Sequence, residues 1–276
     1  MPDLKELQKK ILLIGDAAVG KTSLVKRYVV NKFDDKYIVT IGSKVTAKAI
    51  HFENEGETVH MKLQIWDILG QKGYKKLLNS SFRGTAGVFL VADITRRETL
   101  DSLENYWLPN LLNIVGNIPF IILANKSDLI NQAEFNEQDL RHFADKYDAP
   151  YYLTSAKSGE NVDRAFLILG KRMLRPVAFG PLPSSKVLMP EEIYNNITEL
   201  IDKIIDDFCN EFNRPVDAMH ILRKQFEIAG LDLNNPTEET LKSAVERLAI
   251  VETGFKDREI AEANLKKRLK WIKEST

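Results

Sequence analysis

At residues 10–22 the chain reads Lys10-Ile11-Leu12-Leu13-Ile14-Gly15-Asp16-Ala17-Ala18-Val19-Gly20-Lys21-Thr22. The apolar run that opens this stretch is typical of a buried parallel strand. A loop bounded by glycines follows, and a helix is predicted from Lys21 to Val30. A strand, a tight loop and a helix start in this order fit a phosphate-binding loop, because backbone N–H groups and a helix N-terminus favour an anion. In such a loop Lys21 reaches the β- and γ-phosphates and the Thr22 hydroxyl binds Mg²⁺.

A second motif, Asn125-Lys126-Ser127-Asp128, follows the apolar run 119–124. We therefore expect it at the carboxyl end of a strand, the edge of an α/β sheet at which ligands bind. The Asp128 carboxylate can accept two hydrogen bonds from the N1–H and 2-amino groups of guanine, a donor pair that adenine lacks. Asn125 is expected to tie this loop to the phosphate loop, and the stem of Lys126 to cover a face of the ring. Alone the tetrapeptide could be an Asx turn, but with Ser155-Ala156-Lys157 further along it predicts a guanine-reading site.

With Thr40 and Asp67-Ile68-Leu69-Gly70-Gln71 added, the chain resembles a Ras-superfamily small GTPase, most of all the Rab branch. The Rab-like features are Tyr37-Ile38-Val39-Thr40-Ile41-Gly42, Phe82-Arg83-Gly84-Thr85-Ala86-Gly87, Asp93-Ile94-Thr95 and Trp107. The resemblance covers residues 10–174 or so. It implies the α/β P-loop GTPase fold, a mostly parallel six-stranded sheet with helices on both faces.

The resemblance also implies roles for single residues. Gln71 would orient the attacking water, and Gly70 would donate its N–H to the γ-phosphate, with Lys21 completing the catalytic group. Thr22, Thr40 and Asp67 would hold Mg²⁺, Asp67 through water. The residues expected to contact GTP or GDP are Asp16, Ala17, Ala18, Val19, Gly20, Lys21, Thr22, Ser23, Phe33, Tyr37, Thr40, Asn125, Lys126, Asp128, Leu129, Ser155, Ala156 and Lys157.

Three of these contacts are specified further by the resemblance. Phe33 would stack beside the guanine, and Tyr37 would close over the phosphates. For both side chains, packing in the core or at the surface is the other interpretation. Ala156 would present its backbone N–H to the guanine carbonyl.

The chain departs from the family pattern at several positions. Ala17 and Ala18 stand where Ras has glycines, although other branches have small side chains there. Leu69 replaces the usual Ala or Gly beside the metal and the γ-phosphate, and Lys72 replaces the Glu that Rab proteins usually carry. These differences bear on the hydrolysis rate and on nucleotide exchange more than on binding.

Composition excludes several classes of protein. Lys plus Arg and Asp plus Glu both number 39 in 276 residues, so no net field favours nucleic acid, and no nucleic-acid-reading motif is present. Cys209 is the single cysteine, which excludes a disulfide framework and a zinc site. With no secretory signal and no apolar run long enough to span a membrane, we expect a cytoplasmic protein.

The rest of the first half predicts alternating strands and helices, which favours a mostly parallel sheet. Period-two patterns flank a turn at 54–57 and indicate a hairpin. The expected strands are 45–52, 59–66, 87–92 and 150–154, and the expected helices are 98–114, 137–147 and 161–175.

The length exceeds what one small GTPase needs, so we expect a GTPase domain at 1–175, a Pro-rich linker at 176–190 and an all-α extension at 191–276. Its first helix carries an apolar stripe from Ile193 to Phe208, and a second runs from Pro215 to about Ala229 with Gly230 as its stop. Two more are expected, with apolar positions at Leu241, Val245, Leu248 and Phe255, and at Ile260, Leu265, Leu269 and Ile272. These stripes must be buried, either in a bundle of their own or on the GTPase domain.

The ends of the chain bear on membrane attachment. With no terminal cysteine and with Pro2 after Met1, we expect neither a prenyl nor a myristoyl anchor. The basic stretch 266–273 either contacts an anionic membrane surface peripherally or complements the dipole of the last helix.

Two functions are compatible with these motifs. The first is a switch that hydrolyses GTP slowly when unaided and meets effectors, an exchange factor and an activating protein through two loops, in trafficking or signalling. The second is a nucleotide-bound scaffold that acts through its helical tail. Thr40, Asp67 and Gln71 favour the switch, since a structural site needs neither a γ-phosphate sensor nor a water-positioning amide.

Overall fold

The computed structural model describes residues 4–33, 43–68, 70, 78, 81–175, 196–211, 215–233 and 235–275. The elements divide between two compact units. The α/β unit runs from β1 to α6, and the helical unit from α7 to α10. The predicted linker at 176–190 lies outside the described residues.

A six-stranded sheet in the order β2-β3-β1-β4-β5-β6 forms the centre of the α/β unit. β1 pairs in parallel with β3 and β4, and β5 pairs in parallel with β4 and β6. β2 joins β3 through Glu55 and Gly56, whose positive φ angles of 54° and 83° fit a two-residue hairpin turn. The mostly parallel sheet and its hairpin are therefore confirmed. The strands are β1 Leu4–Ile14, β2 Ser43–Asn54, β3 Glu57–Ile68, β4 Gly87–Asp93, β5 Phe120–Asn125 and β6 Tyr151–Thr154.

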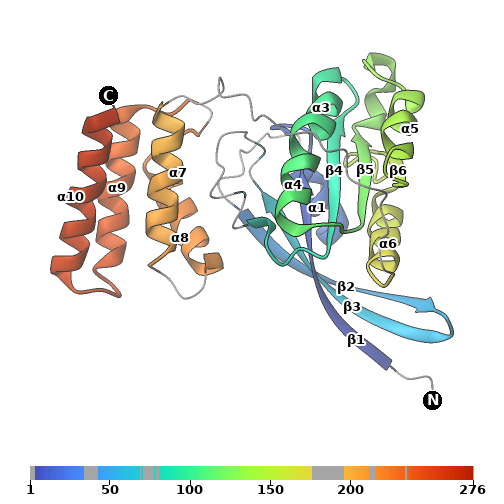
Figure 1. Ribbon diagram of the computed structural model, residues 1–276, viewed down its shortest axis with the longest axis horizontal. Helices are drawn as coiled ribbons and strands as arrows, with labels where there is room; N and C mark the ends of the chain where they lie inside the picture. The colour runs from blue at the N-terminus through green and yellow to red at the C-terminus, as the bar shows by residue number, and fades with distance from the viewer. Residues whose placement is uncertain are drawn as a thin grey trace. The chain divides into compact units, whose positions relative to one another are not determined.

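Helices cover both faces of this sheet (Figure 1). On one face α1 Lys21–Val30 packs beside α6 Val162–Arg172. On the other, α3 Arg97–Ser102 contacts β4, and α5 Glu137–Asp145 contacts β5 and β6. The sequence predicts one helix over 98–114, whereas the structure has α3, a π-helical turn η1 at Leu103–Trp107 and then α4 Leu108–Val115.

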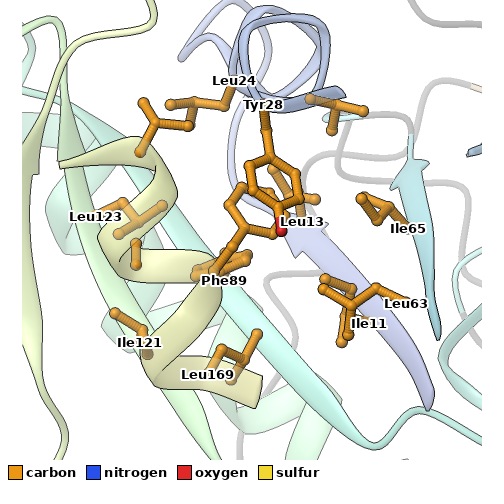
Figure 2. Packing of buried hydrophobic residues seen from close by; sticks show 14 of the residues in the cluster. Ile11, Leu13, Leu24, Tyr28, Leu63, Ile65, Phe89, Ile121, Leu123 and Leu169 are labelled. Carbon is orange, nitrogen blue, oxygen red and sulfur yellow. The ribbon is translucent and has the colours of Figure 1, made fainter. Parts of the chain in front are cut away.

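Alternate strand residues fill the core beneath α1 and α6 (Figure 2). Tyr28 of α1 stacks on Phe166 of α6 with ring centroids 3.6 Å apart, and Phe89 of β4 lies against Phe166. Because successive strand residues point to opposite faces, the same strands supply the second core as well. The carboxyl ends of β1, β3, β4 and β5 are thereby held rigidly at one edge of the sheet.

The helical unit has a core of its own. Its helices are α7 Asn196–Cys209, α8 Pro215–Ile228, α9 Glu238–Glu252 and α10 Arg258–Ser275, which pack on one another (Figure 1). The Thr237 side chain caps α9 by accepting from the Thr240 N–H. Apolar side chains from all four helices are fully buried, among them Ile201, Phe208, Leu222, Phe226, Leu248 and Ile272. The four helices therefore form a bundle with a core of its own, which is one of the two arrangements that the sequence left open.

The apolar positions predicted for the last two helices are partly wrong. Phe255 lies beyond the end of α9 and is 44% exposed, and Ile260 is 45% exposed. Ile272 is fully buried as predicted, whereas Leu265 and Leu269 are only partly buried. The buried face of α10 consists of Ala261, Asn264, Arg268 and Ile272, which follow one another at helical spacing. Two of its four members are polar, so an apolar pattern could not reveal this face.

Candidate nucleotide-binding site

The loop between β1 and α1 has the backbone of a phosphate loop. Gly15 and Gly20 adopt φ angles of 142° and 99°. A Cβ at Gly15 would collide with the Val91 carbonyl, and one at Gly20 with the Asn125 side chain. The close packing of strand and loop therefore requires glycine at both ends.

Ala18 also has a left-handed conformation, with φ of 62°. A residue with a Cβ pays roughly 1–2 kcal/mol in this region, where glycine pays almost nothing. Ala18 is thus the strained point of the loop, and something outside it must hold the conformation.

Lys21, the first residue of α1, is buried at the centre of the site. Its ammonium donates to the carbonyl oxygens of Gly15 and Asp16 at 2.7 and 2.8 Å. Burial lowers the pKa of Lys21 to about 8; Asp67 and Asp16 oppose this shift and the charge of Arg96 adds to it. An anion bound here would relieve the cost of burying the ammonium.

Gly70, which follows β3, lies against this lysine. A Cβ on Gly70 would collide with the Lys21 ammonium and with the Asp16 carbonyl. Gly70 therefore lies beside Lys21, and its contact with a γ-phosphate stays a prediction.

Thr22 and Asp67 supply oxygens suited to Mg²⁺. The Thr22 hydroxyl donates to the Asp67 carboxylate at 2.6 Å, and Asp67 is 1% exposed. A hydroxyl and a carboxylate beside a phosphate loop form the kind of oxygen set that Mg²⁺ takes with substrate phosphates. The two residues present fit the ion; Thr40 lies outside the described residues.

The base-reading loops are tied together around Asn125. Its amide donates to the Val19 carbonyl at 2.9 Å, and its side-chain oxygen accepts from the Ala156 N–H at 3.2 Å. The Ser155 hydroxyl donates to Asp128 at 2.5 Å. The structure thus brings the phosphate loop, 125–128 and 155–157 together, with the Asp128 carboxylate exposed for a ligand.

Arg27 is a site residue that the sequence did not reveal. Its guanidinium reaches from α1 to the carbonyl oxygens of Ala156, at 2.7 Å, and Lys157. Because α1 begins in the phosphate loop, this contact connects the guanine-reading segment to the phosphate-binding helix. The only signal in the sequence was the position of Arg27 on the predicted helix that follows the phosphate loop, which places it near the site.

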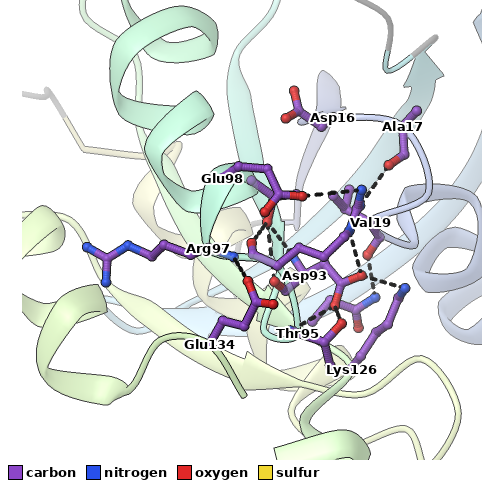
Figure 3. A network of polar contacts seen from close by, with 12 residues as sticks. Asp16, Ala17, Val19, Asp93, Thr95, Arg97, Glu98, Lys126 and Glu134 are labelled. Atoms are coloured by element: carbon purple, nitrogen blue, oxygen red, sulfur yellow. Dashed lines mark hydrogen bonds and ion pairs between the residues drawn. The ribbon is translucent and has the colours of Figure 1, made fainter. Parts of the chain in front are cut away.

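Asp93, at the carboxyl end of β4, is the hub of a polar network (Figure 3). It is 1% exposed and binds the Lys126 ammonium at 2.6 Å, the Thr95 hydroxyl at 2.8 Å and the Arg96 Nε at 3.2 Å. Burial raises the pKa of Asp93, but the hydrogen bonds from Lys126 and Thr95 outweigh burial and hold the pKa below its usual value. The carboxylate therefore stays charged. In the sequence, Asp93 stood out only as part of the Rab-like stretch Asp93-Ile94-Thr95. Its position at the end of a predicted strand is the signal that could have identified it as a site residue.

Asp16 fixes the other side of the phosphate loop. One of its carboxylate oxygens accepts from the Ser102 hydroxyl at 2.7 Å and from the Trp107 indole N–H at 2.8 Å. The π-helical turn η1 lies between those two donors in the chain. Wider turns of this kind are frequent at functional sites, and this one ends on the Trp107 donor.

The other predicted site residues have mixed outcomes. Ser23 follows Thr22 in α1, and Leu129 lies in the short helix η2 Ser127–Gln132. Phe33 packs against the apolar core, so its place beside the guanine stays a prediction. Tyr37, Thr40, Leu69, Gln71 and Lys72 lie outside the described residues.

Comparisons with known proteins agree with this geometry. The model of the Ras family matches residues 10–175. Rab-27B of Rattus norvegicus is 35% identical over 163 residues, which are 56% of this chain and 75% of that protein. Rab-22A of Homo sapiens is 37% identical over 182 residues, or 66% and 89%. The GTP-binding protein ypt1 of Schizosaccharomyces pombe is 36% identical over 177 residues, or 64% and 85%.

These relatives are of Rab type. The residues matched by the family model include the phosphate loop and the guanine-reading loops. Guanine nucleotide with Mg²⁺ is the ligand general to this family. The chain belongs to the Ras family and is a small GTP-hydrolysing enzyme of Rab type.

Proposed function

We propose that this GTPase is a switch in membrane trafficking, which hydrolyses GTP slowly when unaided and works in the cytoplasm or peripherally at a membrane. Effectors, an exchange factor and an activating protein would bind the two loops that contain Thr40 and Gln71. The Rab-type relatives support the trafficking role.

The contact between Gly70 and Lys21 carries this proposal. A γ-phosphate held by Lys21 lies at the point where the loop after β3 begins, so gain or loss of that phosphate acts directly on the loop. Order and disorder of such loops is how phosphate-dependent switches work. A scaffold with a structural nucleotide would need no such contact.

Different residues of the site would have different roles in hydrolysis. Thr22 and Asp67, with Thr40, would hold Mg²⁺, which neutralises charge on the β- and γ-phosphates. Lys21 would bind the same phosphates, and the Gln71 amide would orient the attacking water. As in Ras-type proteins without an arginine finger in cis, unaided hydrolysis would be slow, on the order of 10⁻⁴ s⁻¹.

Single-turnover hydrolysis of GTP by the full chain tests this division of work. Gln71→Leu should slow hydrolysis roughly tenfold or more, since positioned proton transfer and water orientation contribute factors of this size. Its GTP affinity should stay within about twofold, because the amide acts on water and not on the ground-state nucleotide. Equal rates would remove Gln71 from the mechanism, and a wild type that binds GTP without hydrolysing it would favour the scaffold.

We also propose that the helical unit gives this GTPase a docking surface for a protein partner. Its own buried core supports independent folding. Much of its basic stretch is already paired: Lys267 and Arg268 bind Asp207, and Lys270 lies near Glu274. Among the described residues no helix has the length and apolar character that crossing a bilayer takes.

Truncation separates the roles of the two units. A chain that ends at Arg175 should fold and bind GTP, because every nucleotide motif precedes that residue. It should lose the localisation or assembly of the full chain. Altered GDP release or a lower melting temperature after truncation would mean that the helices act on the GTPase instead.

A further inference from the structure

Arg96, three residues beyond the end of β4, reaches the outside of the phosphate loop. We propose that Arg96 is a further positioning residue of the nucleotide site, which holds the strained phosphate loop in its binding conformation through the Ala17 carbonyl. The inference rests on guanine-nucleotide binding at this site and not on trafficking, partners or the rate of hydrolysis.

The position of the guanidinium is fixed by several contacts. Its Nη2 donates to the Ala17 carbonyl oxygen at 2.8 Å. Its Nε bonds the buried carboxylate of Asp93 at 3.2 Å, and its Nη1 lies 3.9 Å from Glu98. Since Asp93 is itself held by Lys126 and Thr95, the arginine is anchored to the rigid edge of the sheet (Figure 3).

Geometry of the peptide unit explains why this carbonyl matters. The C=O of Ala17 and the N–H of Ala18 belong to one planar trans peptide, so they point in opposite directions. A hydrogen bond that fixes the carbonyl also fixes the N–H. Backbone N–H groups of such loops form the cradle for phosphate, so Arg96 orients one member of that cradle without touching the ligand.

Because the phosphate loop is strained at Ala18, contacts from outside the loop are needed to stabilise its conformation. Ala18 keeps its φ of 62° although it carries a Cβ. A left-handed alanine reverts toward right-handed or extended backbone unless its surroundings prevent it. The Arg96 bond lies on the peptide that enters Ala18 and is suited to prevent that reversal.

Charge supports the same role. The Arg96 guanidinium donates to the Ala17 carbonyl, and the Lys21 ammonium donates to the carbonyls of Gly15 and Asp16, so both cations lie against the same loop. A guanidinium stays protonated at every physiological pH, so it contributes a permanent positive field beside the phosphate loop. Phosphate groups would be attracted by both cations.

The shared carboxylate extends the effect to the base. Asp93 binds Arg96 on one side and Lys126 of the guanine-reading motif on the other. Loss of Arg96 would therefore loosen the phosphate loop and remove one of the groups that orient Asp93 beside Lys126.

The test is the rate of GDP release from the full chain, measured with a fluorescent GDP in excess unlabelled GDP. Arg96→Ala should release GDP roughly ten- to a hundredfold faster, the size expected for one hydrogen bond from a charged donor. The matched control is Arg97→Ala. This neighbouring arginine bonds Asp101 and Asp139 at 3.2 and 2.8 Å and should leave release within about twofold of wild type.

Two further variants distinguish positioning from loss of fold. Arg96→Lys keeps the positive charge but lacks the two guanidinium donors that bond Ala17 and Asp93 together. Its GDP release should therefore be slower than that of Arg96→Ala but faster than that of the wild type. Ala18→Gly removes the strain, so adding it to Arg96→Ala should recover most of the lost affinity. That recovery is the non-additivity expected of coupled residues, which a general folding defect would not produce.

The outcomes separate this inference from the proposed function. Equal GDP release in Arg96→Ala, Arg97→Ala and wild type overturns it while leaving the switch intact. Faster release that Ala18→Gly does not correct also overturns it, because the strained peptide is then not what Arg96 holds. Faster release that Ala18→Gly corrects supports it, even if Gln71→Leu hydrolyses GTP at the wild-type rate.

Discussion

The two units of this chain bury charge in opposite ways. In the described part of the α/β unit, the buried Lys, Arg, Asp and Glu side chains are Lys21, Asp67 and Asp93. All of them lie in the phosphate loop or at the carboxyl end of a strand, where a ligand can complete their interactions. The interior beneath the helices is apolar. Buried charge in this unit therefore marks the site.

In the helical unit the two fully buried charges, Arg268 and Glu252, bind each other. Arg268 is fully buried, with one nitrogen 2.7 Å from Glu252, also fully buried, and another 2.9 Å from Asp207. Asn264 donates to Glu252 from the same face of α10. These ion pairs join α7, α9 and α10, so the charges are compensated by partners within the unit. Burial alone thus does not identify a functional charge; the position of the charge relative to a strand end or loop does.

Asp128→Asn should show the largest effect in the α/β unit. The carboxylate accepts two hydrogen bonds from guanine, each worth about 1.5–3 kcal/mol when one partner is charged, so GTP should bind roughly 10²- to 10⁴-fold more weakly. Xanthosine nucleotides should gain relative affinity, because xanthine has a carbonyl acceptor where guanine has its 2-amino donor. Competition binding measures both changes.

The control for this variant is Asp101→Asn on α3, whose carboxylate is exposed and pairs with Arg97. It should bind GTP as the wild type does. If wild-type protein bound ATP as tightly as GTP, Asp128 would not be the base-reading group.

Arg268→Met should show the matching effect in the helical unit. It leaves Glu252 buried without its counter-charge, which typically costs about 3–5 kcal/mol. Chemical denaturation followed by far-UV circular dichroism should show an early loss of helix. Combining it with Glu252→Leu should restore much of the stability, since an apolar pair of similar volume often replaces a buried ion pair without loss.

Arg258→Met on the same helix is the matched control. Arg258 forms an exposed pair with Glu262 at 2.9 Å, so its loss should change the free energy of unfolding by less than about 1 kcal/mol. Equal destabilisation by the two variants would show that burial of the Arg268 cluster is not what aligns the helices.

Protonation of Lys21 should give the smallest effect. The pKa of this lysine is about 8 because of burial, and bound phosphate would raise it. Affinity for GDP should therefore be level below pH 8 and fall above it, by at most about tenfold per pH unit, because binding must then take up a proton. Isothermal titration in buffers of different ionisation enthalpy would detect that proton.

Lys21→Arg serves as the control for this pH dependence, since a guanidinium does not titrate in this range. Whatever affinity the variant keeps should be independent of pH up to the range in which guanine itself ionises. The same slope in both proteins would exclude Lys21 as its origin.

Much of the α/β unit was predictable because its signals are local. Apolar runs predicted the buried strands, and short motifs at their ends predicted Lys21, Thr22, Asn125 and Asp128. The family resemblance supplied Asp67 and Gly70. A site at the end of parallel strands needs only the chain order of those motifs to bring them together.

The contacts that the sequence did not reveal are long-range ones. Arg96 and Arg27 bind backbone carbonyls, which every residue possesses, so no pattern of side chains announces their partners. The π-helical turn before Trp107 changes which residues face the phosphate loop, and periodicity averages over such a turn. In α10 the buried face contains Arg268, which a search for apolar positions passes over.

Hydrogen exchange of the full chain, with and without excess GDP and Mg²⁺, compares the two units in one experiment. If buried charge in the α/β unit awaits a ligand and buried charge in the helical unit does not, GDP should slow amide exchange at 15–22, 125–128 and 155–157 and leave α7 to α10 unchanged. Slower exchange within α9 and α10 on adding GDP, or no protection at the three loops, would contradict this division of the molecule.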